Sequence, residues 1–342
     1  MTASRPPGAG PRLRFGFIPT EGGRFYPEAL AEVERAEALG FDSVWMEEHH
    51  GVRDHYWPSP LVVLAGFATR TTRLLLGTDV VVLPFHDPVR AAEDAALVDV
   101  MSNGRLVFGV AIGYRPEEFA LYRTPLAGRG ARSEEALTLI RALWTQERVT
   151  HPGPCYPLTG ARIEPRPVQQ PHPPIWIGGW QPRSLRRAAR LGDAWVPGPT
   201  ASLPKLLAAK ATYLAERAAA GRPAPATWPL TRDTVIADTD ARAIELAERH
   251  LLVNYRDEYG GGRWGHPLIG AEDRTPVDRL DGLAADRFVV GGPERCIAQL
   301  RRFVEAFGAD HLVFRLYFPG MPHAHILREL ELLAREVFPA FR

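Results

Sequence analysis

Residues 41–50 read FDSVWMEEHH, a short apolar run that ends abruptly in two carboxylates and two imidazoles. The run over 42–46 predicts a β-strand. In a barrel of parallel strands, reactive side chains gather at the carboxyl ends of the strands, so this pattern favours a barrel. Side chains alternate along a strand, so we expect one of His49 and His50 to face a site and the other to support it.

Similar short runs recur along the chain and alternate with longer segments whose apolar residues have helical spacing. Helices are expected at 27–39, ended by Gly40, and at 133–145, begun at Ser133. The expected strands are 13–19, 42–46, 74–83, 106–111, 174–178, 194–197, 231–236 and 311–316. Eight such units predict an α/β fold, a single (β/α)8 TIM barrel with insertion loops at the carboxyl face of the strands. An open doubly wound sheet has the same alternation, and only the motifs decide between the two.

The length and net charge of the chain exclude some classes of function. The chain has 342 residues, and 41 Lys and Arg against 40 Asp and Glu give a formal net charge of +1. We therefore expect no nucleic-acid and no membrane partner. A signal-peptide pattern and a long apolar run are both missing, and the two cysteines are far apart, which predicts a cytoplasmic protein with reduced thiols. We expect a flexible segment over 1–12 and a barrel over 13–342, with insertions near 148–173 and 257–287.

Two further segments carry glycines where a ligand could approach. Residues 76–84 read LGTDVVVLP, and Gly77 lets a flat group come close to the strand. Residues 173–184 read PPIWIGGWQPRS, where a strand gives way to a helix at Gly178 and Gly179. Backbone N–H groups at such a turn bind phosphate, although a plain turn needs the same glycines. The pattern is not the GxGxxG fingerprint of a nicotinamide-binding fold.

Residues 47–50 are also metal ligands by residue type. Their spacing differs from the helical His-Glu-x-x-His pattern of zinc hydrolases, so we predict no metal site. A metal-dependent barrel hydrolase is kept as an alternative.

In this order and spacing, the segments resemble the luciferase-like monooxygenase superfamily, which includes the alpha subunit of bacterial luciferase. The likeness extends from about residue 13 to residue 341 and is most specific over 43–122. The stretches that carry it are Val44-Trp45, Glu48-His49-His50, Leu76-Gly77-Thr78, His86-Asp87-Pro88-Val89-Arg90, Glu93-Asp94, Gly104-Arg105, Phe108-Gly109, Pro174-Ile175-Trp176-Ile177-Gly178-Gly179 and Val290-Gly291-Gly292-Pro293.

The resemblance implies a bound flavin and a set of site residues. His49 matches the luciferase histidine associated with the flavin–oxygen intermediate, and Glu48 and His50 are assigned with it as catalytic. Ile112 stands where luciferase has a phosphate-binding arginine, which leaves the phosphate cradle open. Family members often carry a non-proline cis peptide behind the isoalloxazine ring, and that strand here holds 78–80. The implied cofactor-binding residues are Thr78, Asp79, Val80, Ile112, Gly113, Tyr114, Gly178, Gly179, Gln181 and Ser184.

The same resemblance implies a reaction. Reduced FMN, delivered by a separate flavin reductase, would react with O₂ to give a peroxyflavin that oxygenates a small organic substrate. His49 would donate a hydrogen bond or accept a proton. One alternative is hydride transfer with the deazaflavin coenzyme F-420 on the same barrel, and another is a flavin-binding protein without turnover. The family is also compatible with a homodimer.

Overall fold

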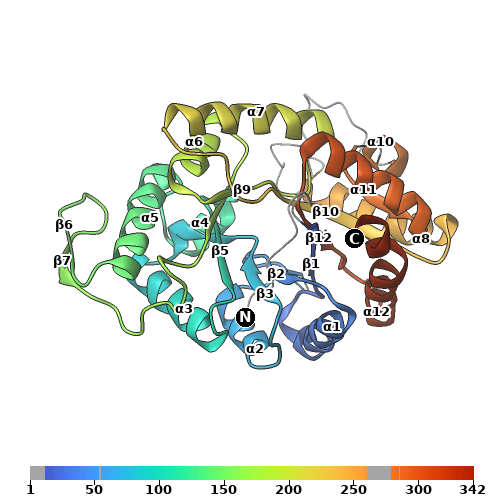
Figure 1. Cartoon of the computed structure of the whole chain (residues 1–342), viewed down its shortest axis with the longest axis horizontal. Helices are drawn as coiled ribbons and strands as arrows, with labels where there is room; N and C mark the ends of the chain where they lie inside the picture. Colours follow the sequence, from blue (N-terminus) through green and yellow to red (C-terminus); the bar gives the residue numbers. More distant parts are fainter. Residues whose placement is uncertain (1–11, 54, 260–278, 285) are drawn as a thin grey trace, which may run out of the picture.

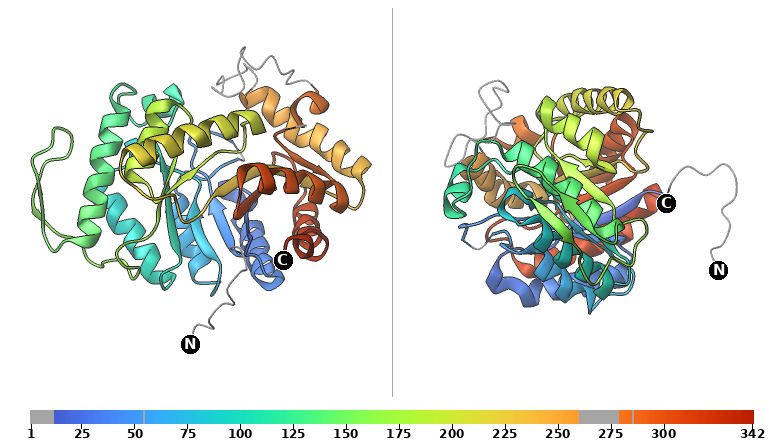
Figure 2. Two further views of the ribbon diagram at one scale, coloured as in Figure 1. Left: turned by 45° about the horizontal axis from the view of Figure 1, so that its top comes forward. Right: turned by 90° about the vertical axis from the view of Figure 1, so that its left-hand side faces the viewer.

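The computed structural model describes residues 12–53, 55–259, 279–284 and 286–342. Its centre is a curled parallel sheet with helices covering the outer face (Figure 1, Figure 2). The strands of this sheet are β1 (Arg14–Ile18), β2 (Ser43–Met46), β3 (Leu75–Thr78), β4 (Val81–Val82), β5 (Leu106–Ala111), β8 (Ile175–Gly178), β9 (Ala194–Val196), β10 (Pro229–Ile236), β11 (Val289–Gly291) and β12 (His311–Arg315).

Helices follow most strands and pack their apolar faces on the sheet. They are α1 (Tyr26–Leu39), α2 (Pro60–Ala68), α3 (Pro88–Met101), α4 (Pro116–Leu121), α5 (Arg129–Thr145), α6 (Pro182–Leu191), α7 (Leu203–Ala219), α8 (Asp240–Leu246), α9 (Leu252–Asn254), α10 (Leu280–Ala284), α11 (Pro293–Phe307) and α12 (His323–Leu332). The sequence start and stop signals of α1 are confirmed, because Pro27 lies in its first turn and Gly40 ends it in a left-handed conformation.

The strands of the sheet follow the order β11-β10-β12-β1-β2-β3-β5-β8-β9, with β4 beside β5. Its two ends approach each other where β9 contacts β10. There Arg232 of β10 donates from Nη1 to the carbonyl oxygen of Pro199, after β9, at 2.8 Å. Among the described residues, the backbone pairings do not include β9 with β10. The predicted parallel α/β fold is therefore confirmed, whereas closure into a complete (β/α)8 barrel stays a prediction.

A small cluster of buried apolar side chains, which includes Trp45 and Trp176, fills the inside of the curled sheet. Trp45 stacks on Trp176 with ring centroids 4.7 Å apart. A Cβ atom on Gly77 would lie 2.1 Å from the Trp45 ring, so the flat group that approaches this glycine is the Trp45 indole. Gly77 is thus explained by packing of the core rather than by a ligand.

The structure corrects three expectations about single elements. The expected strand 74–83 is two strands, β3 and β4, separated by a cis peptide bond between Asp79 and Val80. Helix α5 begins at Arg129, four positions before the expected start, and the Ser133 hydroxyl donates to the Arg129 carbonyl inside the helix instead of capping it. The short strand β11 before α11 was not predicted, because its three residues give too little pattern.

Residues 148–173 do not lie at the carboxyl ends of the strands, so this part of the insertion prediction is wrong. The antiparallel strands β6 (Val149–His151) and β7 (Leu158–Ala161) form a hairpin that extends outward beyond α5 (Figure 1). The Gln169 amide then donates to the Leu106 carbonyl at 2.7 Å, at the amino end of β5. The segment connects a helix to the next strand, which places it at the opposite end of the sheet from the strand termini that carry Glu47–His49.

Most of the second expected insertion, 257–287, and residues 1–11 of the expected flexible segment lie outside the described residues. Within the described part of the chain, no helix is both long enough and apolar enough to cross a membrane.

Candidate active site

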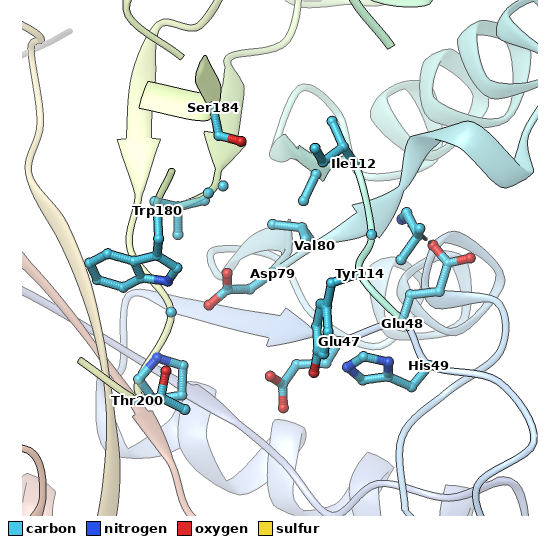
Figure 3. Close-up of a pocket in the computed structure, with 18 of the residues that line it drawn as sticks. Glu47, Glu48, His49, Asp79, Val80, Ile112, Tyr114, Trp180, Ser184 and Thr200 are labelled. Carbon is cyan, nitrogen blue, oxygen red and sulfur yellow. Dashed lines mark hydrogen bonds between the residues drawn. The ribbon is translucent and has the colours of Figure 1, made fainter. Parts of the chain in front are cut away.

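A cavity of about 520 Å³ opens at the carboxyl ends of the strands (Figure 3). Its wall comes from residues at the ends of β2, β3, β4, β5, β8, β9 and β12, with additions from α4, α5 and α6. The lining residues are Glu47, Glu48, His49, Asp79, Val80, Val82, Ala111, Ile112, Gly113, Tyr114, Glu118, Arg129, Gly178, Gly179, Trp180, Gln181, Ser184, Val196, Gly198, Pro199, Thr200 and Arg315.

The cavity brings together nearly all the residues that the sequence singled out. His49 and the Gly178–Gly179 turn border the same space, although they are far apart in the sequence. Two expected residues lie outside it. Thr78 is buried, and its hydroxyl exchanges hydrogen bonds with the carbonyl and N–H of Gly109 at 2.7 and 2.8 Å. His50 is turned away from the cavity.

His49 is the histidine that faces the cavity. Its Nδ1 lies 2.8 Å from Glu118 Oε1, in the first turn of α4, and its ring contacts Tyr56 and Tyr114 with centroids 4.5 and 6.0 Å away. Burial raises the pKa of Glu118, but the hydrogen bond and charge of His49, the His50 N–H and the Arg115 charge together lower it by more, so the net shift is downward. An ionised carboxylate only accepts hydrogen bonds, so Nδ1 carries a proton, and Nε2 is an acceptor whenever the ring is neutral.

Glu48 is a buried anchor. Its Oε1 accepts from Nε2 of His50 and of His86, both at 2.9 Å, and its Oε2 accepts from the Val82 N–H at 2.7 Å. Burial raises the pKa of Glu48, but these hydrogen bonds and the His86 charge lower it to about 2. Tyr122 completes the environment of His50, with its hydroxyl 3.0 Å from Nδ1. Glu48 therefore connects the end of β2 to β4 and His86, and His50 connects Glu48 to Tyr122.

A cluster of carboxyl groups surrounds Arg315 in the inner wall. Arg315 Nε lies 2.6 Å from Asp233 Oδ1, and its Nη1 lies 3.5 Å from Glu47 Oε2. Asp79 Oδ2 accepts from the Thr231 hydroxyl at 2.6 Å. Burial raises the pKa of Asp79 to about 8, and the neighbouring Glu47 adds to the shift. The site thus holds a carboxyl group that is protonated at neutral pH.

The opposite end of the cavity contains a glycine turn, the start of a helix and a guanidinium group. Gly179 has a φ of 141°, and a Cβ atom there would lie 2.5 Å from the Ser184 Cβ, so the turn needs a glycine. The Trp195 indole N–H holds the Gly179 carbonyl at 2.9 Å. Arg129 lines the same space, and its Nε donates to the Gly113 carbonyl at 3.1 Å. The start of α6 and this guanidinium provide positive potential where Ile112 offers none.

A family model described as luciferase-like monooxygenase matches residues 15–311. The chain belongs to the luciferase-like monooxygenase family. This family member is therefore an oxidoreductase, and its relatives are monooxygenases and dehydrogenases.

Two curated relatives of this luciferase-like protein have different cofactors in their names. The oxygenase component of flavin-dependent trigonelline monooxygenase from Acinetobacter baylyi is 28% identical, over 93% of this chain and 90% of that protein. A glucose-6-phosphate dehydrogenase from Microbacterium testaceum, dependent on F-420, is 32% identical, over 96% of this chain and 98% of that protein. The crystal structure of a monooxygenase from Streptomyces bottropensis superposes with a TM-score of 0.84 at 25% identity, covering 96% of this chain and 100% of that chain.

The cis peptide expected of a luciferase-like protein is confirmed between Asp79 and Val80. Both residues line the cavity at the break between β3 and β4. Ile112, Gly113 and Tyr114 follow β5 and border the cavity as well. These residues at the strand ends therefore border one cavity.

Sequence reasoning missed three charged residues of this site. Arg315 ends β12, so the strand-end rule applied to Glu47 could have identified it. The sequence signal for Glu118 was weaker, and consists only of its place in a helix that closely follows Tyr114. Arg129 gave none, because the start of α5 reaches the cavity only through the tertiary packing of that helix. Among the described residues, no group of three His, Cys, Asp or Glu side chains is arranged to hold a metal ion.

Proposed function

We propose that this protein is a flavin-dependent monooxygenase that uses reduced FMN and O₂ to oxygenate a small organic substrate. The observation that carries the proposal is one cavity bordered by His49 and by the Gly178–Gly179 turn before α6. A phosphate-bearing flavin needs an anion-binding turn and a reactive group separated by the length of its ring and side chain. The cavity volume, about 520 Å³, is in the ordinary range for cofactor sites.

The residues present fit such a cofactor. Gly179, Gln181, Ser184 and Arg129 would hold the phosphate, because they combine helix N–H groups, a hydroxyl and a guanidinium. The apolar side chains of Val80, Val82, Ala111 and Ile112 line the same cavity, and a ring could pack against them. Bound reduced FMN would supply the electrons for the reaction with O₂.

The side chains at the other end would control protons and water. His49 would accept a proton through Nε2, since Glu118 keeps the other ring nitrogen protonated. Both oxygens of Glu48 are engaged, so we assign Glu48 and His50 positioning roles in place of the catalytic roles first expected. Trp180 and Thr200 face His49 and Glu47 across the cavity and would contact the substrate (Figure 3).

Supply of reduced flavin would come from a separate reductase. The relative from Acinetobacter baylyi is named as an oxygenase component, which supports a two-component arrangement here. The F-420-dependent relative supports the alternative of hydride transfer on the same scaffold.

The two cofactors can be tested side by side. Purified protein is mixed anaerobically with reduced FMN or with reduced coenzyme F-420, binding is followed by absorbance, and O₂ is then admitted in an oxygen electrode. We expect saturable binding of reduced FMN and a changed rate of O₂ consumption relative to free FMN. The matched variant His49→Asn should bind reduced FMN but lose the changed rate. Binding of F-420 with hydride transfer and no O₂ consumption would instead establish the deazaflavin alternative, and flavin binding without any rate change would indicate a non-catalytic carrier.

A further inference from the structure

Asp79 is a carboxylic acid in the inner wall of the cavity whose chemistry the proposed function does not use. Its backbone N–H donates to the Met46 carbonyl at 2.8 Å, which fixes the main chain at the end of β3. Its side chain projects into the space between Trp180 and Glu47 (Figure 3). The Thr231 hydroxyl donates to Oδ2 at 2.6 Å and so orients the carboxyl group.

The charged groups around Asp79 come from several strands. Glu47, at the end of β2, repels the ionised form, and Arg315, at the end of β12, attracts it. The guanidinium of Arg315 is shared with Asp233 of β10, at 2.6 Å, and with Glu47. Behind Glu47 lies Glu21, whose pKa burial and the Glu47 charge raise well above its ordinary value. The Arg315 guanidinium therefore already pairs with two other carboxylates, those of Asp233 and Glu47.

Together, these effects raise the pKa of Asp79 and keep its carboxyl group protonated at neutral pH. Burial raises its pKa to about 8, the Glu47 charge acts in the same direction, and the Thr231 hydrogen bond and the Arg315 charge oppose them. A carboxyl group that is neutral at pH 7 in a ligand cavity can donate a proton as well as accept a hydrogen bond.

We propose that Asp79 is the proton donor of this site, giving its proton to a ligand oxygen or nitrogen on which negative charge develops during the reaction. The carboxyl O–H bond breaks, its electron pair stays on the carboxylate, and the proton forms a new O–H or N–H bond on the ligand. The Thr231 hydroxyl and the Arg315 charge stabilise the carboxylate until it takes up a proton from water. The inference rests on the proposed function, because it places the flavin and the substrate in this cavity. It also gives the site one donor, Asp79, and one acceptor, His49 Nε2.

The protonation of Asp79 can be measured without any cofactor. In an infrared titration of the unliganded protein, the carbonyl stretch of a protonated carboxyl group is isolated by subtracting the spectrum of Asp79→Asn. This band should disappear with a midpoint near pH 8. Glu47→Gln removes the repelling charge and should move the midpoint down, whereas Thr231→Val removes the stabilising hydrogen bond and should move it up.

A second buried carboxyl group provides a matched control for this measurement. Glu329, in α12, accepts from the Ile236 N–H at 2.9 Å, and burial raises its pKa to about 7. It does not line the cavity. Glu329→Gln should therefore remove a different band and leave the Asp79 band and its midpoint unchanged.

The role in turnover is tested with reduced FMN and O₂ as the probe reaction, which yields FMN and hydrogen peroxide. Wild-type turnover should fall as the pH rises through 8, because the donor ionises. Asp79→Asn keeps the shape of the side chain but has no acidic proton, so its rate at pH 7 should fall about 100-fold and lose the alkaline decline. The fall should lie in kcat, with KM for reduced FMN changed less than about threefold.

Each outcome is decisive. An ionised Asp79 throughout pH 5–9, or an Asp79→Asn variant with the wild-type rate and pH profile, would overturn this inference while the proposed function stands. A wild-type protein that neither binds reduced FMN nor alters its reaction with O₂ would overturn the proposed function itself. If Asp79→Asn does not fold, the opposite shifts of the pH–rate profile in Glu47→Gln and Thr231→Val still test the assignment, and unshifted profiles would refute it.

Discussion

The substitution Glu48→Gln tests whether the buried anchor beside the cavity stabilises the fold by its charge. Glu48 accepts three hydrogen bonds, from His50, His86 and the Val82 N–H. Glutamine has the same shape, but its amide cannot attract two imidazole N–H groups as a carboxylate does, and its NH₂ group would face one of these donors.

The magnitude follows from the shift in the pKa of Glu48, from an ordinary 4.5 to about 2. This difference corresponds to about 3 kcal/mol in the free energy of unfolding. Because the folded-state pKa is lowered, the contribution is present above pH 4.5 and is lost as the pH falls toward 2. We therefore expect Glu48→Gln to destabilise the protein by about 3 kcal/mol at pH 7 and by progressively less below pH 4.5.

Urea unfolding, followed by tryptophan fluorescence at pH 7 and at pH 3, measures this difference. Glu164→Gln is the control for a lost carboxylate, since Glu164 is exposed and its pair with Arg162 should contribute less than about 0.5 kcal/mol. A second readout is His86. Burial lowers the pKa of His86, but the hydrogen bond and charge of Glu48, together with the Asp94 charge, raise it by more. In Glu48→Gln the NMR titration of His86 should therefore shift to lower pH. Equal urea midpoints of variant and wild type at pH 7, with an unmoved His86 titration, would refute the argument.

Three further predictions concern the site and its surroundings. Glu118→Gln should leave FMN binding within about threefold but change the ¹⁵N shifts and pH–rate profile of His49, because the amide no longer demands a proton on Nδ1. Arg129→Met should weaken FMN binding about 10- to 100-fold by fluorescence titration and leave riboflavin binding unchanged, since only FMN carries the phosphate. We expect the homodimer compatible with the family to bury Val62 of α2 and Met101 of α3, which are 72% and 42% exposed in this chain. Val62→Asp with Met101→Asp should then halve the mass measured by light scattering, and an unchanged mass would contradict a dimer through this surface.

The sequence predicted those parts of the site that depend only on neighbouring residues in the chain. The apolar run that ends in Glu47–His50 and the turn at Gly178–Gly179 each combine a strand with its carboxyl end, and parallel strands bring such ends to one edge. The alternation rule also predicted that only one of His49 and His50 faces the cavity. These predictions need no knowledge of how distant elements pack.

Features set by tertiary packing were out of reach. The side-chain directions of Glu118 and Arg129 depend on where α4 and α5 lie against the sheet. The strand expected over 74–83 is divided between β3 and β4 at residues 79–80, and beyond the break the Val82 N–H is bound by the Glu48 side chain. No periodicity in the sequence reports such a contact.

In the proposed function, the two ends of the cavity separate cofactor affinity from reactivity. Arg129, Gly179 and Ser184 lie where a phosphate would bind, and FMN and coenzyme F-420 carry the same kind of ribityl phosphate. A substitution at that end should therefore weaken both cofactors alike. His49, at the other end, and Asp79, between Trp180 and Glu47, would act where the two cofactors differ. One cofactor reacts with O₂ and the other transfers only hydride. Because proton transfer at His49 and Asp79 acts on the reacting atoms, substitutions there should alter rate and pH dependence at nearly constant affinity.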